Sequence, residues 1–224
     1  MFSKELNKKL DEYHLLNHPF YKSWNDGKLT REIIKDYAEQ YYQHVKAFPR
    51  YISATHSLCE DLDKRKILLE NLQDEEKDGA DHPKLWKNFA LAIGADAEKI
   101  ENVKREKFTS DLINNFFKNG RSSYAEGLAS LYTYERQIPE IAETKIRGLK
   151  NHYGVTSKQG LEFFEVHKAA DVYHRQACEK LLDVMSKEEQ EKAEKSALST
   201  AKHLWNFLTG IAAVSYTHLT LPTN

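Results

Sequence analysis

Helix-forming sequence extends along almost the whole chain, and this feature limits its fold more than any other. Apolar residues recur at helical spacing in nearly every segment of the 224 residues. Only nine glycines and five prolines interrupt them, which favours long helices over a strand-rich fold. We find no strand pattern, internal repeat or internal linker. The sequence therefore predicts an all-α bundle of seven to eight helices, formed by a single domain over residues 1–214.

Local signals place several helix boundaries. Thr30 is expected to cap a long helix that Pro49 kinks rather than ends. A second long helix is expected over residues 122–153. Ser186-x-x-Glu189 is a capping box for the last helix, which should end near residue 214.

The final ten residues, SYTHLTLPTN, do not follow the helical period. They are rich in threonine and end in Pro-Thr-Asn. We expect residues 215–224 to be a disordered or non-native tail without a function.

Composition excludes several classes of function. Charged residues make up 30% of the chain and its formal net charge is −1, so no field of one sign favours nucleic acid or an anionic membrane. No apolar run approaches the roughly 20 residues of a membrane span. The N-terminal segment is charged and amphipathic, unlike a secretory signal. Two cysteines are too few for a disulfide framework, and a reducing cytoplasm is the expected location.

One motif carries most of the chemical information. His167, Asp171 and His174 are spaced i, i+4 and i+7, so on a helix their side chains share one face. Phe163 and Phe164 lie nearby, which suggests that this face points inward. Two imidazoles and a carboxylate together are typical of a transition-metal site. A buried Asp171 paired with an arginine or lysine would be the structural alternative.

Two further segments offer ligands of the same types. Glu75 precedes His82 by about two helical turns, with Gly79 and Pro83 between or beside them to redirect the histidine. Asp74 or Glu76 would replace Glu75 in another register. Glu135 lies in an otherwise apolar stretch, where an ion pair with a lysine is the alternative. The acidic run around Glu75 would otherwise be a solvated surface.

The six candidate ligands comprise three carboxylates and three histidines, enough for two metal ions. Mixed carboxylate and imidazole ligands suit iron or manganese, whereas a hydrolytic zinc site normally needs only three protein ligands. Paired iron or manganese ions in helical bundles activate dioxygen. The sequence thus points to oxidative chemistry.

Several segments together carry a family resemblance that runs from about Leu10 to Val214. They are HPFYKSW, YAEQYYQHVKAFPRY, LLENLQDEE, LYTYERQIPEIAETKIRGL and the His-x3-Asp-x2-His motif. In these segments the chain resembles the chlamydial CADD proteins and their bacterial relatives. These are haem-oxygenase-like dimetal oxidases, related in fold to the pyrroloquinoline-quinone synthase PqqC and the TenA thiaminases. The resemblance implies a haem-oxygenase-like bundle.

The resemblance also implies a site and an activity. It implies that six residues bind two metal ions: Glu75, His82, Glu135, His167, Asp171 and His174. The ions are iron and/or manganese, and the family preference is a mixed pair. The implied activity is oxygen-dependent formation of para-aminobenzoate for folate synthesis, with an external reductant and an unidentified electron donor. Tyr21 matches the tyrosine thought to supply the carbon skeleton. Lys145 matches the lysine thought to donate the amine, and Tyr134 matches a tyrosine near the metals.

Helix geometry alone does not select these three residues. There are 12 tyrosines in the chain, and Tyr21 would otherwise be an ordinary half-buried aromatic residue. Lys145 follows Glu135 by ten residues, which on one continuous helix places it on a flank rather than beside the ligand. There it would be a surface lysine unless its stem bends inward.

Other functions stay open at this stage. A TenA-type thiaminase would use a cysteine nucleophile, and Cys178 lies one turn after His174, but six ligands would be unexplained. Cofactorless PqqC-type oxidation has the same difficulty. An N-oxygenase or desaturase acting on an external substrate, and an interaction protein for host death domains, are the remaining alternatives. Apolar residues around Trp205 and Phe207 suggest a homodimer.

Overall fold

The computed structural model describes the backbone of residues 1–220 and the side chains of residues 1–168 and 173–214. It confirms the predicted all-α fold, since helices form nearly all of this part and it contains no strand. The elements are α1 (Phe2–Leu10), η1 (Asp11–Tyr13), η2 (Leu15–Asn17), α2 (Pro19–Asn25), α3 (Arg31–Val45), α4 (Phe48–Ser57), α5 (Leu62–Glu75), α6 (His82–Ala92), α7 (Ala97–Asn102), α8 (Lys107–Ser122), α9 (Tyr124–Glu135), α10 (Ile138–His152), α11 (Lys158–Asp183) and α12 (Lys187–Thr220).

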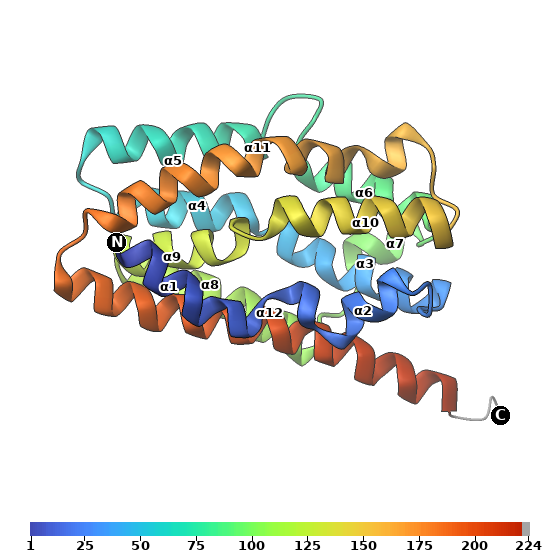
Figure 1. Ribbon diagram of the computed structural model, residues 1–224. Helices are drawn as coiled ribbons and strands as arrows, with labels where there is room; N and C mark the ends of the chain where they lie inside the picture. The colour runs from blue at the N-terminus through green and yellow to red at the C-terminus, as the bar shows by residue number, and fades with distance from the viewer. Residues whose placement is uncertain (221–224) are drawn as a thin grey trace.

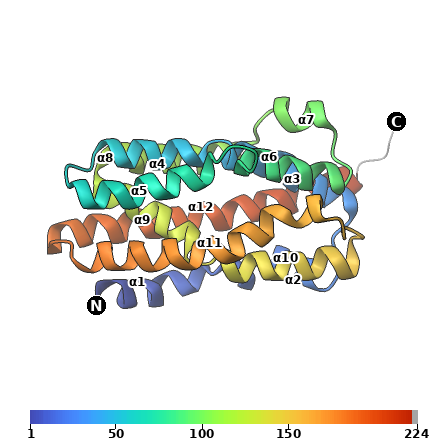
Figure 2. The same ribbon diagram turned by 90° about the horizontal axis from the view of Figure 1, so that it is seen from above.

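Helices broken at mid-length define the architecture. The pairs α4 and α3, α5 and α6, and α9 and α10 each lie end to end along the bundle in both views (Figures 1 and 2). By contrast, α11 and α12 run along most of the bundle without interruption. The breaks of α5–α6 and α9–α10 fall beside the middle of α11. The ends of several helices therefore meet in the interior next to one continuous helix.

Prolines account for two of these breaks, and these breaks contribute to a number of helices above the seven to eight predicted. One long helix was expected to begin at Thr30 and to contain Pro49, and another was expected over residues 122–153, but α3 ends at Val45 and α9 ends at Glu135. Pro49 and Pro139 lie in the first turns of the helices that follow. Each lacks the N–H that would bond the carbonyl four residues earlier, and its ring clashes with that carbonyl. Pro49 therefore ends the first helix rather than kinking it.

The predicted helix starts are confirmed by their hydrogen bonds. Thr30 Oγ1 accepts from Ile33 N at 3.3 Å. Ser186 and Glu189 form the reciprocal capping box, with bonds of 2.8 and 3.3 Å. These contacts satisfy N–H groups that the first helical turn leaves free.

The last helix extends further than predicted. α12 continues to Thr220 rather than ending near residue 214. Residues 221–224 and the side chains of 215–220 lie outside the described part, so the non-native origin of this tail stays a prediction.

Large aromatic side chains fill the interior. Trp24, Trp86, Tyr37, Tyr51 and Tyr132 are all fully buried. Phe207 is buried in this same core and Trp205 packs against Tyr13 and His18, so both already have partners within the chain; the homodimer stays a prediction. Within the described residues, none of the helices combines the length and apolar character needed to span a membrane.

Candidate metal centre and the adjoining tyrosine–lysine cluster

Three predicted ligands from three helices meet in the interior. Glu75 is the last residue of α5, His82 is the first residue of α6, and His167 lies within α11. One ligand atom from each lies within 4.8 Å of the others, and all three residues are buried. α5 ends at Glu75 rather than near Lys77. The loop of residues 76–81 then leads back to this helix end, so that His82, at the start of α6, lies against Glu75.

Local backbone chemistry explains this return. Asp81 caps α6 by accepting from Lys84 N at 2.9 Å, and Pro83 occupies the first turn, where its missing N–H costs nothing. Gly79 supplies the left-handed backbone of the turn, with φ of 78°. His82 therefore enters the site at a helix start rather than on a redirected continuation of α5.

His167 is oriented as a metal ligand would be. Its Nδ1 lies 2.6 Å from the carbonyl oxygen of Phe163, so this nitrogen donates and leaves Nε2 with a free lone pair. Burial holds the pKa of His167 well below its ordinary value, and His82 lowers it further. A neutral imidazole with one oriented lone pair is the form that binds a metal.

The contact between Glu75 and His82 also fits a cation. His82 Nδ1 lies 2.8 Å from Glu75 Oε2, yet this buried nitrogen has no hydrogen-bond partner of acceptable geometry. A cation between the carboxylate and the two imidazoles would satisfy these lone pairs. The nitrogen and oxygen donors suit iron or manganese.

Glu135 is buried at the end of α9, in a setting that stabilises its protonated form when no cation is present. Burial raises the pKa of Glu135 to about 8, and Glu75 adds to the rise, while the hydrogen bond from Asn71 opposes it. Asn71 Nδ2 donates to Glu135 Oε1 at 2.6 Å. The Sγ atom of Cys178, the nucleophile in the thiaminase alternative, lies 3.9 Å from Glu135 Oε2.

His174 is buried on α11 and faces the end of α5. Its Nε2 lies 3.2 Å from Oδ2 of Asp74, whose side chain is half exposed. Burial lowers the pKa of His174, and Asp74 opposes this shift. The sequence offered Asp74 as a substitute for Glu75, but Asp74 instead contacts His174, another predicted ligand. The side chain of Asp171 lies outside the described residues, so its ligand role stays a prediction.

The structure corrects the expected position of Lys145. Its side chain is 3% exposed rather than on a flank, because the break after α9 restarts the helical register in α10. Its Nζ donates to Tyr37 Oη at 2.5 Å. Five aromatic rings surround the amine at 4.9 to 5.7 Å: Tyr21, Tyr37, Tyr41, Trp86 and Phe164. Burial holds the pKa of Lys145 well below its ordinary value, which favours the neutral form of the amine.

Tyrosines connect this amine with the ligand end of α9. The hydroxyls of Tyr21 and Tyr37 are 3.5 Å apart, and the rings of Tyr37 and Tyr41 stack at 5.3 Å. Tyr41 Oη then donates to Tyr134 Oη at 2.9 Å. Tyr134 immediately precedes Glu135. The cluster therefore contains all three residues that the family resemblance singled out.

Sequence reasoning missed Tyr37 and Tyr41. They lie four residues apart in YAEQYY, so they share one face of α3, and this spacing was the available signal. Asn71, which orients Glu135, gave no distinct signal in the sequence.

The lysine and one predicted ligand face the same small cavity. It is lined by Tyr41, Tyr134, Ile138, Ile141, Ala142, Lys145, Phe163, Phe164 and His167. Its volume is about 10 Å³, close to the least that holds one water molecule. The cavity is too small for an aromatic substrate.

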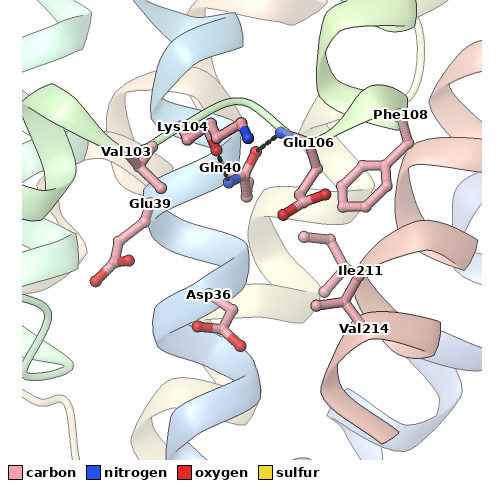
Figure 3. A pocket seen from close by; sticks show the side chains of 9 residues that line it. All are labelled: Asp36, Glu39, Gln40, Val103, Lys104, Glu106, Phe108, Ile211 and Val214. Carbon is pink, nitrogen blue, oxygen red and sulfur yellow. Dashed lines mark hydrogen bonds between the residues drawn. The ribbon is translucent and has the colours of Figure 1, made fainter. Parts of the chain in front are cut away.

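A larger pocket lies elsewhere, between α3, the segment before α8, and α12 (Figure 3). It has a volume of about 260 Å³, and its acidic residues are Asp36, Glu39 and Glu106. Gln40 links its walls by donating to Lys104 O and accepting from Glu106 N. None of the predicted site residues lines it, so it is distinct from the buried cluster.

Comparison with known proteins places this architecture in a family. The chain belongs to the TENA/THI-4/PQQC family, whose match covers residues 4–213. It is 38% identical over 209 residues to the 4-aminobenzoate synthase of Chlamydia muridarum, covering 92% of this chain and 88% of that protein. The protein of the same name from Nitrosomonas europaea is also 38% identical, over 223 residues, with 94% and 90% covered. The resemblance inferred from the motifs is therefore confirmed.

The fold is confirmed independently. A domain with a haem-oxygenase-like fold from Shewanella denitrificans superposes with a TM-score of 0.80 at 17% identity, covering 97% of this chain and 93% of that one. At this identity the likeness establishes the fold alone.

Proposed function

We propose that this chain forms 4-aminobenzoate in an oxygen-dependent reaction, taking the carbon skeleton from Tyr21 and the nitrogen from Lys145. The names of relatives at 38% identity support the product. The position of the Lys145 amine supports this lysine as the source of the nitrogen, and this single observation carries the proposal. A buried amine whose pKa is lowered, 5.7 Å from the centre of the Tyr21 ring, is chemically suited to donate nitrogen to that ring.

The size of the cavity argues against an external aromatic substrate. The space beside Lys145 and His167 is close to the smallest that holds one water molecule, so an aromatic ring does not fit in it. An enzyme that uses a ring from its own sequence needs no channel for a substrate of that size.

The residues of the candidate centre have the ligand types that two iron or manganese ions require. Glu75, His82 and His167 would hold one ion, and Glu135, His174 and Asp171 would complete the second site. Iron or manganese bound there would activate dioxygen for one-electron oxidations, with electrons from an external reductant. Asn71 and the Phe163 carbonyl would orient Glu135 and His167.

Product chemistry constrains what happens at Tyr21. An aminobenzoate contains the ring and one carboxyl carbon, so the Cα–Cβ bond of Tyr21 must break and Cβ must be oxidised. The Lys145 nitrogen must replace the phenolic oxygen, which leaves as water, and the Cε–Nζ bond of Lys145 must break as Cε is oxidised, with dioxygen as the oxidant for both oxidations. Tyr37 lies between the two groups and holds the amine through its hydroxyl. Each chain supplies one tyrosine, so the yield is at most one product per chain.

Isotope labelling combined with mass spectrometry tests the proposal. The full chain is produced with ring-labelled tyrosine and ε-¹⁵N-lysine, loaded with iron and manganese, reduced and exposed to air. We expect 4-aminobenzoate that carries both labels, at no more than one molecule per chain, with mass loss on the peptides that contain Tyr21 and Lys145.

Two phenylalanine variants control this experiment. Tyr21→Phe should form no product. Tyr42→Phe removes a hydroxyl that bonds Glu101 on another part of the bundle and should leave the yield unchanged. Product without label, or many products per chain, would instead favour an oxygenase that acts on an external substrate. Binding to host death domains would require neither metal nor Tyr21.

A further inference from the structure

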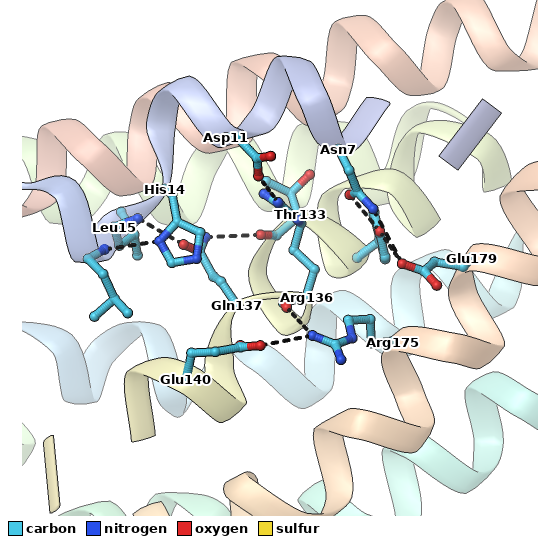
Figure 4. Close-up of polar contacts among 12 residues, drawn as sticks. Asn7, Asp11, His14, Leu15, Thr133, Arg136, Gln137, Glu140, Arg175 and Glu179 are labelled. Carbon is cyan, nitrogen blue, oxygen red and sulfur yellow. Dashed lines mark hydrogen bonds and ion pairs between the residues drawn. The ribbon is translucent and has the colours of Figure 1, made fainter. Parts of the chain in front are cut away.

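Side chains from other segments hold the turn that follows Glu135 (Figure 4). This turn, residues 136 and 137, joins α9 to α10. Arg136 pairs with Asp11 through its guanidinium group. Gln137 is buried, accepts from Leu15 N at 3.0 Å and donates to Thr133 O at 3.2 Å. The N-terminal segment thus anchors one side of the turn.

Arg175 of α11 anchors the other side. Its Nη1 donates to the backbone carbonyl of Arg136 at 3.1 Å and to Glu140 Oε1 at 3.2 Å. Arg136 immediately follows Glu135, and Arg175 immediately follows His174. A single hydrogen bond therefore joins the neighbours of two predicted ligands that belong to different helices.

The helix break makes such an anchor necessary. Pro139 has no N–H to bond the carbonyl of Glu135, so the regular helical hydrogen bonds of α9 end with the bond from Arg136 N to Tyr132 O at 2.9 Å. A residue at a helix end moves more freely than one in a helix interior. Glu135 is nevertheless buried and must keep one orientation if it binds a metal. The Arg175 bond to the next carbonyl restricts that movement from the α11 side.

We infer that Arg175 is a positioning residue for the second metal site, where it fixes Glu135 relative to His174. This inference rests on the proposed two-metal centre. Arg175 lies outside the triad of Glu75, His82 and His167, so its removal should affect one ion and spare the other. Residues that orient metal ligands typically contribute 10- to 100-fold in affinity.

Titration of the metal-free full-length protein with Mn²⁺, followed by the electron paramagnetic resonance signal of free Mn²⁺, tests this inference. We expect wild type to bind two ions. Arg175→Met should bind the first with unchanged affinity and the second at least about 10-fold more weakly. Arg175→Lys, which keeps a donor for the Arg136 carbonyl, should restore much of the second affinity. Circular dichroism checks that each variant remains helical.

Two further variants separate the carbonyl bond from the ion pairs. Lys168→Met breaks another contact between α11 and α10, the 3.4 Å pair with Glu143, and should bind two ions like wild type. Glu140→Gln removes the charge partner of Arg175 but leaves the carbonyl bond, and should also bind like wild type.

The outcomes distinguish this inference from the proposed function. Wild type binding fewer than two Mn²⁺ ions would overturn the two-metal centre itself. Two ions in wild type with equal affinities in Arg175→Met would overturn only the role of Arg175. A loss in Glu140→Gln or Lys168→Met as large as in Arg175→Met would also overturn it, because general packing between α10 and α11 would then explain the effect.

Discussion

Lys145 is buried at a cost to stability. The unfolded chain carries a charged lysine at neutral pH, whereas burial lowers the pKa of the folded amine, so folding favours release of its proton. Aromatic rings surround the amine, and its hydrogen bond goes to the Tyr37 hydroxyl. A residue that serves only packing would be apolar here. The amine is therefore best explained by the nitrogen donation we propose.

Replacing this lysine should stabilise the protein in a pH-dependent manner. The pKa of Lys145 is lowered in the folded state, so wild-type stability rises with pH up to the ordinary lysine pKa. Lys145→Met should be more stable than wild type at pH 7, and this advantage should shrink as the pH rises toward the ordinary lysine pKa. Urea unfolding at several pH values measures the difference.

Lys150→Met, at an exposed position on the same helix, is the control and should change stability by no more than about 0.5 kcal/mol at any pH. A Lys145→Met variant that is less stable than wild type at pH 7 would contradict the burial of a neutral amine.

The close contact between two helices brings Tyr21 and Lys145 together. Gly148 of α10 packs against Trp24 of α2, and a Cβ at position 148 would lie 2.4 Å from Trp24 Nε1. Tyr21 precedes Trp24 by three residues, and Lys145 precedes Gly148 by three, so each pair shares a helix face. His18 caps α2 by accepting from Phe20 N at 3.0 Å, which sets the direction of that face.

Gly148→Ala should therefore separate the two reacting groups. The added methyl group must displace Trp24, which we expect to cost about 1–3 kcal/mol of stability and to lower the yield of 4-aminobenzoate. The predicted ligands lie on other helices, so Mn²⁺ binding should stay close to wild type. Parallel measurement of product and metal content checks this. Equal losses of both would indicate general disruption.

At the scale of the whole molecule, the broken helices concentrate charge and polarity in the interior. α5, α6, α9 and α11 each contribute a predicted ligand, so the two proposed ions together would link four helices that are otherwise held by side-chain packing. In the absence of a cation, the buried carboxylates and imidazoles weaken the bundle where it is broken. Metal binding and folding stability should therefore be coupled.

Metal removal should lower the stability of the folded chain. At Mn²⁺ concentrations about 100-fold above the dissociation constant, we expect a gain of about 2.7 kcal/mol per bound ion over the metal-free protein. His82→Ala should lose the gain from the ion held by the Glu75 triad and keep its helical circular dichroism. Thermal unfolding with and without Mn²⁺ measures both. An equal metal-dependent shift in His82→Ala would remove His82 from the ligand set.

Local patterns were enough to predict the all-α class, the caps at Thr30 and Ser186, and the residue types of the candidate centre. These features depend on contacts within a few residues, which the sequence displays directly. The family motifs likewise identified Tyr21, Lys145 and Tyr134, whose roles stay predictions.

Long-range packing decided the remaining features. The end of α9 at Glu135 resets the register that buries Lys145, and the return of the chain after α5 sets His82 against Glu75. The alignment of Tyr37 and Tyr41 with Tyr21 and Tyr134 joins three helices. Such placements depend on how separate helices pack and on where a break restarts the helical phase. Spacing along the chain predicts which residues share a helix face, but only the packed bundle determines which faces meet.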